Sequence, residues 1–247
     1  MTKFDLSGAW DDAVQLLRGD LALTSALAGA FVLLPALAYA LIGPVPFEPA
    51  PGADMVQIAA GLRAELPQLA PILVVFALLS SLTAMAVTRL WLAPAGTSVG
   101  EALAFAVALL PALLLLFAIQ ALATGLAAMA FLLPALYLAG RWAPTVAVLA
   151  AGETRSPVDA LAAAWNMTRG NGWRIAIMLV LVQIIVVVVT VLIDGLGGVF
   201  GARGTIGYAF ASMVSAAVAA AAALVGYALN TAIYRQLSQS RLARTFD

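Results

Sequence analysis

The sequence contains no cysteine and no histidine in its 247 residues. Without cysteine there are no disulfide bonds and no thiolate chemistry, and without either residue the ligands of the common zinc sites are missing. Histidine is also the side chain that most often serves as a general base near neutral pH. We therefore expect no catalytic activity, no cofactor and no metal site.

Charge is also scarce. Charged residues make up 10% of the chain, hydrophobic residues make up 64%, and the mean hydropathy is +1.05. A soluble domain has about 25% charged and about 45–50% apolar residues. This chain has too little charge to cover a water-soluble globule and too much apolar sequence to be disordered. Its 12 basic and 12 acidic residues balance, so we expect no basic surface for nucleic acid. The composition predicts an integral membrane protein.

A helix that crosses a bilayer needs about 20 mainly apolar residues. The predicted spans are about 21–43, 68–92, 102–123, 127–151, 173–193 and 206–234. The apolar run 102–140 is long enough for two spans, so it must contain a turn, which we place near Thr124 and Gly125. Pro134 and Pro144 are expected to kink the fourth span. The first span is expected to be retained, because it is longer than the roughly 7–15 apolar residues of a signal peptide.

Amphipathic segments accompany these spans. Helices at the membrane surface are predicted at about 7–18, 54–66 and 156–169. The segment 54–66 could lie flat on the membrane or extend the second span. Ser98 with Glu101, and Ser156 with Asp159, have the spacing of capping boxes at helix starts. The sequence thus predicts an all-α fold, with residues 1–247 forming a single domain of six transmembrane helices and amphipathic surface helices.

The distribution of basic residues predicts the orientation. Six spans place both termini on one side of the membrane. Of the 12 Lys and Arg residues, only Arg63 and Arg203 fall on the other side. Because loops rich in Lys and Arg stay in the cytoplasm, both termini are expected to be cytoplasmic.

The stretch 141–174 contains a longer motif. It runs from Arg141-Trp142-Ala143-Pro144 through Glu153 and Pro157 to Trp165-Asn166-Met167-Thr168-Arg169-Gly170-Asn171-Gly172-Trp173-Arg174. This pattern resembles the membrane domain found with some glycerophosphodiester phosphodiesterases and is similar to the YciC-like family of bacterial inner-membrane proteins. The resemblance implies six helices and the inner membrane. It does not imply phosphodiesterase activity, which belongs there to a separate soluble domain with histidine and metal-binding residues.

Four charged residues near the predicted cytoplasmic surface form a candidate site: Arg141, Glu153, Arg169 and Arg174. Basic pockets on this side of a membrane can bind anionic lipid headgroups. Arg141 lies within the fourth predicted span, where a charge is costly and indicates function by default. The alternative is that Arg141 extends to the surface beside Trp142 and serves only as an interfacial anchor.

Gln120 and Gln183 are polar residues in the middle of predicted spans. Each is expected to make an interhelical hydrogen bond, and Tyr227 and Asn230 are interpreted in the same way. The alternative is that the two glutamines line a polar cavity together with Arg141. The alanines at 219–223 predict a surface for close helix packing.

These features predict a non-enzymatic inner-membrane protein that acts in envelope or membrane maintenance. Its expected partners are lipids, including anionic headgroups, and a membrane protein or a second copy of the chain. The alternative function is a small transporter or lipid translocator with a polar site between its helices. An ion-coupled pump is disfavoured, because such pumps usually need an acidic residue within a span.

Overall fold

The computed structural model describes residues 4–45, 47, 49–50, 52–93, 96–197 and 201–245. These residues form helices joined by short loops, with no strand among them. Six helical segments are long and apolar enough to cross a membrane: Leu21–Ile42, Met55–Leu92, Leu110–Ala130, Leu132–Ala151, Gly172–Ile193 and Ile206–Gln239. The predicted all-α architecture with six membrane-spanning segments is therefore confirmed.

The N-terminal part begins with the amphipathic α1 (Leu6–Gly19), where a helix was predicted at about 7–18. The first span is a continuous helical run made of α2 (Leu21–Ala28), the π-helical η1 (Gly29–Leu33) and α3 (Leu34–Ile42). The long α4 (Met55–Leu92) starts at a capping box of Asp54 and Gln57. At 1.5 Å per residue α4 is about 57 Å long, well beyond a hydrocarbon core about 30 Å thick. The segment 54–66 therefore extends the second span and is not a separate helix.

The middle of the chain forms a helical hairpin. It is preceded by α5 (Val99–Ala108), whose predicted capping box is present, since Ser98 donates through its N–H and its hydroxyl to the Glu101 carboxylate. These bonds lower the pKa of Glu101 below its ordinary value. The hairpin consists of α6 (Leu110–Ala130) and α7 (Leu132–Trp142), and its turn is the extended Phe131, with a φ of −169°.

The turn predicted near Thr124 and Gly125 is wrong, because α6 continues through both residues. The Thr124 hydroxyl donates to the Gln120 carbonyl at 2.6 Å, so it bonds within the helix. At 21 residues, α6 is about 31 Å long, which suffices to cross the hydrocarbon core. A turn near Gly125 would have left it shorter than the core.

The C-terminal part contains α8 (Thr145–Ala151), α9 (Pro157–Met167), α10 (Gly172–Gly197) and α11 (Ile206–Thr245). Pro144 lies in the break between α7 and α8, where a kink was predicted. Ser156 caps α9 by accepting a hydrogen bond from the Asp159 N–H at 3.3 Å. The helix α11 continues beyond the predicted end of the sixth span.

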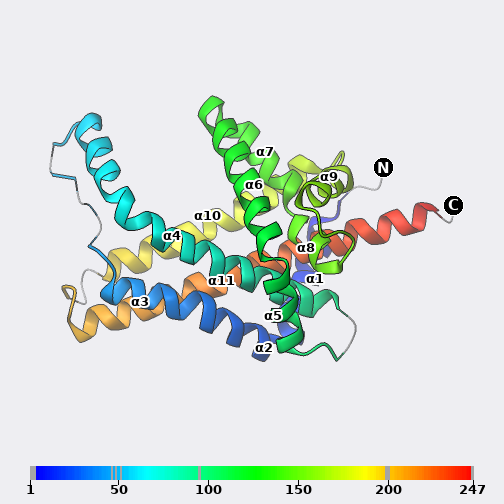
Figure 1. Ribbon diagram of the computed structural model, residues 1–247, viewed down its shortest axis with the longest axis horizontal. Coiled ribbons are helices and arrows are strands. Elements are labelled where there is room, and N and C mark those ends of the chain that lie inside the picture. Colours follow the sequence, from blue (N-terminus) through cyan, green and yellow to red (C-terminus); the bar gives the residue numbers. More distant parts are fainter. Residues whose placement is uncertain are drawn as a thin grey trace.

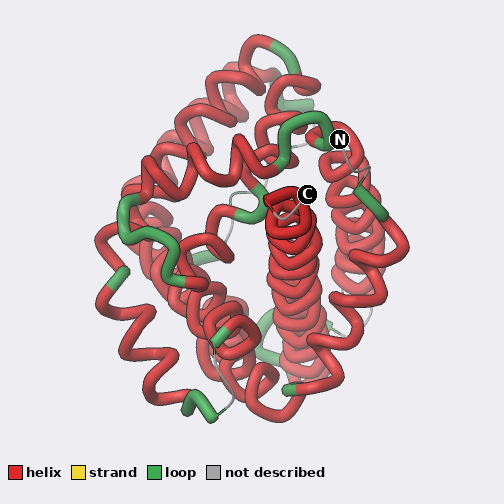
Figure 2. Tube along the Cα trace, turned by 90° about the vertical axis from the view of Figure 1, so that its right-hand side faces the viewer, coloured by secondary structure: helices red, strands yellow, loops and turns green. Residues whose placement is uncertain are grey.

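The central element is α11, which packs against α1, α2, η1, α3, α4, α8 and α10. Figure 2 looks along α11 and shows other helices on several sides of it. Figure 1 shows α1, α5, α8, α9 and the last turns of α11 together at one end of the bundle, here named the α1 end. Both ends of the described chain therefore lie on the same side, as six spans require.

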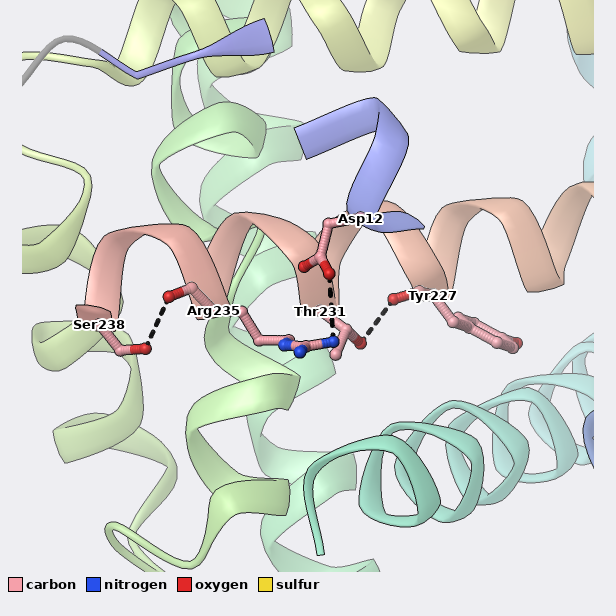
Figure 3. A network of polar contacts seen from close by, with 5 residues as sticks. All are labelled: Asp12, Tyr227, Thr231, Arg235 and Ser238. Atoms are coloured by element: carbon pink, nitrogen blue, oxygen red, sulfur yellow. Dashed lines mark hydrogen bonds and ion pairs between the residues drawn. The ribbon is translucent and has the colours of Figure 1, made fainter. Parts of the chain in front are cut away.

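The core is densest near the α1 end. Ala228, Leu229, Ala232 and Ile233 of α11 have no exposed surface, and α8 is buried along most of its length. Polar contacts add to this packing, and Figure 3 shows Asp12 of α1 pointing toward Arg235 of α11. The shortest distance between their charged atoms is 3.2 Å. This partly exposed ion pair accompanies the apolar contact between α1 and α11, in which Ala9, Ala13 and Leu16 of α1 are buried.

The position of the hairpin turn can be tested by cysteine labelling, since the chain has no native cysteine. We expect a membrane-impermeant maleimide to label Phe131→Cys in intact proteoliposomes, because the turn lies at the membrane surface. Gly125→Cys should stay unlabelled, because it lies about 9 Å further along α6, within the hydrocarbon core. Labelling of Gly125→Cys without Phe131→Cys would place the turn at the earlier position.

Candidate functional site

A cavity of about 930 Å³ lies within the bundle between α4, α6, the α7–α8 segment, α10 and α11. These helices form a ring, because α4 packs on α6 and α11, α7 packs on α6 and α10, and α10 packs on α11. The residues lining the cavity are Ala77, Ser80, Ser81, Ala84, Phe117, Gln120, Ala121, Thr124, Ala139, Trp142, Ala143, Val146, Leu179, Val182, Gln183, Val186, Thr190, Ala219, Ala222, Ala223, Gly226, Tyr227, Leu229 and Asn230. The volume is at the upper end of the range of about 300–1,000 Å³ for ligand sites.

Two polar residues of the cavity wall lie near the middle of membrane-spanning helices. Gln120 is ten residues from the start of α6 and Gln183 is eleven residues from the start of α10. At 1.5 Å per residue both amides are about 15–17 Å from the α1 end of their helices, about half of a 30 Å core. The two mid-span glutamines, one on α6 and one on α10, therefore line the same cavity.

The predicted interhelical hydrogen bonds of these glutamines are not found. Within the described part of the chain, the side-chain amides of Gln120 and Gln183 bond to no other protein group. Tyr227 does make an interhelical contact, since its hydroxyl donates to the Ser80 carbonyl of α4 at 3.3 Å. Asn230 does not bond through its side-chain oxygen, which is buried and has no partner among the described residues.

The cavity wall contains small and uncharged residues. None of the lining residues is Asp, Glu, Lys or Arg. Ala219, Ala222, Ala223 and Gly226 of α11 leave space where larger side chains would fill it. Of the alanines at 219–223, Ala220 is buried in helix packing as predicted, whereas Ala219, Ala222 and Ala223 line the cavity. The spacing of the cavity residues on α11 follows one helix face, which is the sequence signal that could have indicated the cavity.

Arg141 is not part of this cavity, in contrast to the predicted lining. Its side chain is 4% exposed and lies buried within the protein. The guanidinium carbon lies 3.9 Å from the centre of the Trp165 ring and 5.6 Å from that of Tyr137. It donates to the Tyr137 hydroxyl at 2.9 Å and to the Trp165 carbonyl. Neutral acceptors and aromatic faces therefore stabilise a buried cation here.

The longer motif around Arg141 has a structural explanation. The Thr168 hydroxyl donates to the Arg141 carbonyl at 3.0 Å, and the Asn171 side chain accepts from the Phe4 N–H at 3.0 Å. Glycine is required where α7 meets α10, because a Cβ on Gly140 would lie 2.6 Å from the Gly172 carbonyl oxygen. These contacts join α7, α9, α10 and the segment before α1 at the α1 end.

The four charged residues of the predicted headgroup site have separate surroundings. Arg141 is buried, whereas Glu153, Arg169 and Arg174 are exposed. Glu153 accepts a hydrogen bond from the Tyr234 hydroxyl, and Arg174 donates to the Phe4 carbonyl at 3.4 Å. Their side chains share no hydrogen bond or ion pair in the described part of the chain. That part also contains no group of three or more acidic residues placed to hold a metal ion.

The structural role of Arg141 can be tested with Arg141→Lys. Lysine keeps the buried charge but loses ring stacking and one hydrogen bond, so we expect a loss of about 2 kcal/mol in unfolding free energy. Thermal unfolding followed by tryptophan fluorescence in detergent measures this effect. The control is the exposed Arg169→Lys, for which a change within about 0.5 kcal/mol is expected. Equal stability of both variants would contradict the structural role.

Comparisons with known proteins give no further information about the function. No protein-family model, no curated protein and no solved structure matches the chain. The cavity is the feature whose size and lining are compatible with a ligand.

Proposed function

We propose that this protein binds a bilayer amphiphile in the cavity and acts in membrane maintenance by lipid handling, without catalysing a reaction. The observation that carries the proposal is the uncharged cavity between the membrane-spanning helices. In this proposal the protein resides in the bacterial inner membrane with both termini in the cytoplasm, in keeping with its basic-residue distribution and the motif at 141–174.

The chemistry of the wall favours an amphiphile over an ion. A transported ion needs carbonyl or charged ligands, and proton coupling usually needs a buried acidic group. The wall has mostly alanine, valine and leucine, with a few amide and hydroxyl groups between them. An apolar pocket with a few polar groups is typical of sites that bind small molecules with an apolar body.

The arrangement of the helices favours entry from the bilayer. The cavity is partly open, and Figure 1 shows the α6–α7 hairpin diverging from α4 and α10. Both α6 and α10 also carry exposed apolar residues, namely Leu122, Leu126, Ile184 and Ile185. Such surfaces are compatible with lipid chains, so an amphiphile can reach the cavity laterally without crossing water.

The proposal can be tested by filling the cavity. Ala222→Leu adds volume to a residue of the wall, whereas Ala221→Leu changes the exposed neighbour on α11 that is not part of the wall. Native mass spectrometry of protein extracted from membranes should detect bound lipid in the wild type and in Ala221→Leu. We expect Ala222→Leu to retain at least about fivefold less, because added methylene groups overfill the site. Equal lipid retention in all three proteins would refute cavity binding.

Lipid translocation is a second candidate, favoured by the mid-helix positions of Gln120 and Gln183. A polar site halfway through the core lowers the cost of moving a polar headgroup across. A fluorescent lipid in proteoliposomes, bleached from outside by dithionite, measures this movement. Dithionite bleaches only lipid in the outer leaflet, so about half of the fluorescence is lost without translocation. Translocation therefore predicts a loss of more than half for the wild type and Ala221→Leu, and a loss of about half for Ala222→Leu. Loss of about half in every case would leave lipid binding without translocation.

A further inference from the structure

We propose that the cavity takes its ligand from the leaflet opposite the α1 end and is closed to the leaflet at the α1 end. This inference rests on the proposed function, because it concerns the amphiphile that the same cavity binds. It goes beyond that function by stating from which side of the membrane the ligand comes. Its basis is how the burial of the helices differs on the two sides of the cavity.

A packed layer separates the cavity from the α1 end. The helix α4 runs toward this end, where Arg89 in its last turn donates to the Ala150 carbonyl of α8 at 2.7 Å. The α4 wall residues nearest this end, Ser81 and Ala84, are buried, and the next residues 85–87 have no exposed surface.

The other helices of the ring continue this layer. Its residues on α6, α8, α10 and α11 are at most 2% exposed, namely Leu113, Leu116, Ala147, Val148, Leu149, Ala150, Ile175, Ala176, Ala232 and Ile233. Packed protein interiors leave few spaces larger than a water molecule. A lipid that came from the α1 end would therefore have to separate the helices of the core.

On the opposite side of the cavity the same helices are exposed. The wall residues farthest from the α1 end on three of them, Ala77 of α4, Ala139 of α7 and Ala219 of α11, are exposed. Beyond the wall, apolar residues of α4, α6, α7 and α10 are at least 50% exposed, namely Leu73, Val74, Val75, Leu126, Met129, Phe131, Leu132, Leu133, Val188, Val191 and Leu192. Burial thus decreases in one direction around the ring, away from the α1 end.

The α6–α7 hairpin bounds this open side and is anchored at its base. Leu113 and Leu116 of α6 are buried there, and a Cβ on Gly140 of α7 would lie 2.7 Å from the Ala176 nitrogen of α10. The tip at Phe131 is exposed, and Figure 1 shows the hairpin diverging from α4 toward this tip. A lipid chain can therefore enter between α4 and the hairpin on the side away from the α1 end.

This asymmetry amounts to a choice of leaflet. Both ends of the described chain lie at the α1 end, so the open side faces the other leaflet, which is the outer leaflet in the proposed orientation. Moving a polar headgroup through hydrocarbon is costly, so the lipids of the two leaflets are separate pools for a binding site. An opening to one leaflet favours binding of that leaflet's lipid over translocation between leaflets.

The test delivers a photoactivatable lipid to one leaflet. A phosphatidylcholine with a diazirine in its acyl chain is exchanged into the outer leaflet of sealed proteoliposomes that hold the full chain in both orientations. The chain has no native cysteine, so Arg169→Cys, an exposed position at the α1 end, reacts with an impermeant biotin-maleimide only where that end faces outward. After irradiation and solubilisation, avidin separates the two orientations of the same sample.

Labelling is then located on the wall by peptide fragmentation at Gly226 and Tyr227. We expect the molecules without biotin to be labelled there at least about fivefold more than the biotinylated ones, because the polar headgroup keeps the probe in the outer leaflet. In the molecules without biotin that leaflet is the one opposite the α1 end. This comparison needs no substitution in the cavity.

A pair of variants locates the entrance. Ala219→Trp adds a large side chain at the exposed end of the wall, and Ala221→Trp adds the same side chain at an exposed position of α11 outside the wall. In the molecules without biotin, Ala219→Trp should lower the labelling of Gly226 and Tyr227 at least about fivefold, whereas Ala221→Trp should leave it within about twofold.

The outcomes separate this inference from the proposed function. Equal labelling in the two orientations, or stronger labelling of the biotinylated molecules, together with its loss in Ala222→Leu, would overturn the leaflet inference and leave cavity binding intact. Labelling that Ala222→Leu does not reduce, or no labelling of the wall in either orientation, would refute phospholipid binding in the cavity and the leaflet inference with it. Undiminished labelling in Ala219→Trp would refute an entrance at this end of the wall.

Discussion

The close approach of α11 to its neighbours is the contact on which the other features depend. Apolar side chains gain little from leaving lipid, so helices in a membrane associate through dispersion and hydrogen bonds over short distances. The buried alanines at positions 228 and 232 allow this approach near the α1 end, where Leu229 and Ile233 fill the remaining space. Further along α11, the small residues meet no partner of matching size, and the cavity is the result.

The buried Arg141 sets the position of the hairpin that completes the cavity wall. Its contacts with Tyr137 and Trp165 hold the end of α7 against α9, and Gly140 and Gly172 bring α7 close to α10. Trp142 and Ala143, directly after Arg141, then line the cavity. Arg141, which the sequence suggested as a ligand-binding residue, therefore packs α7 against α9 in the structure. The same contacts account for much of the motif at 141–174.

The cavity and the charged surface are separate features of the protein. Exposed basic residues such as Arg169 and Arg174 lie at the α1 end, while the cavity wall is uncharged. Basic residues at a membrane surface can orient a chain and contact anionic headgroups. The uncharged wall contains hydrogen-bonding groups without a partner in the described part of the chain, among them the side-chain amides of Gln120 and Gln183.

The sequence by itself determined the class of fold, because the length and hydropathy of each span depend only on local composition. It also indicated the capping box at Ser98 and Glu101, which depends on residues three apart. It did not determine the turn at Phe131. The apolar run 102–140 is uninterrupted, so a turn at any of several positions would have a similar free-energy cost. Tertiary structure alone decided that Gln120, Gln183 and Asn230 meet around one cavity and that Arg141 is buried outside it. Residues far apart in the sequence share a site because of how the helices are arranged around α11. The hydropathy of a single sequence does not contain that arrangement.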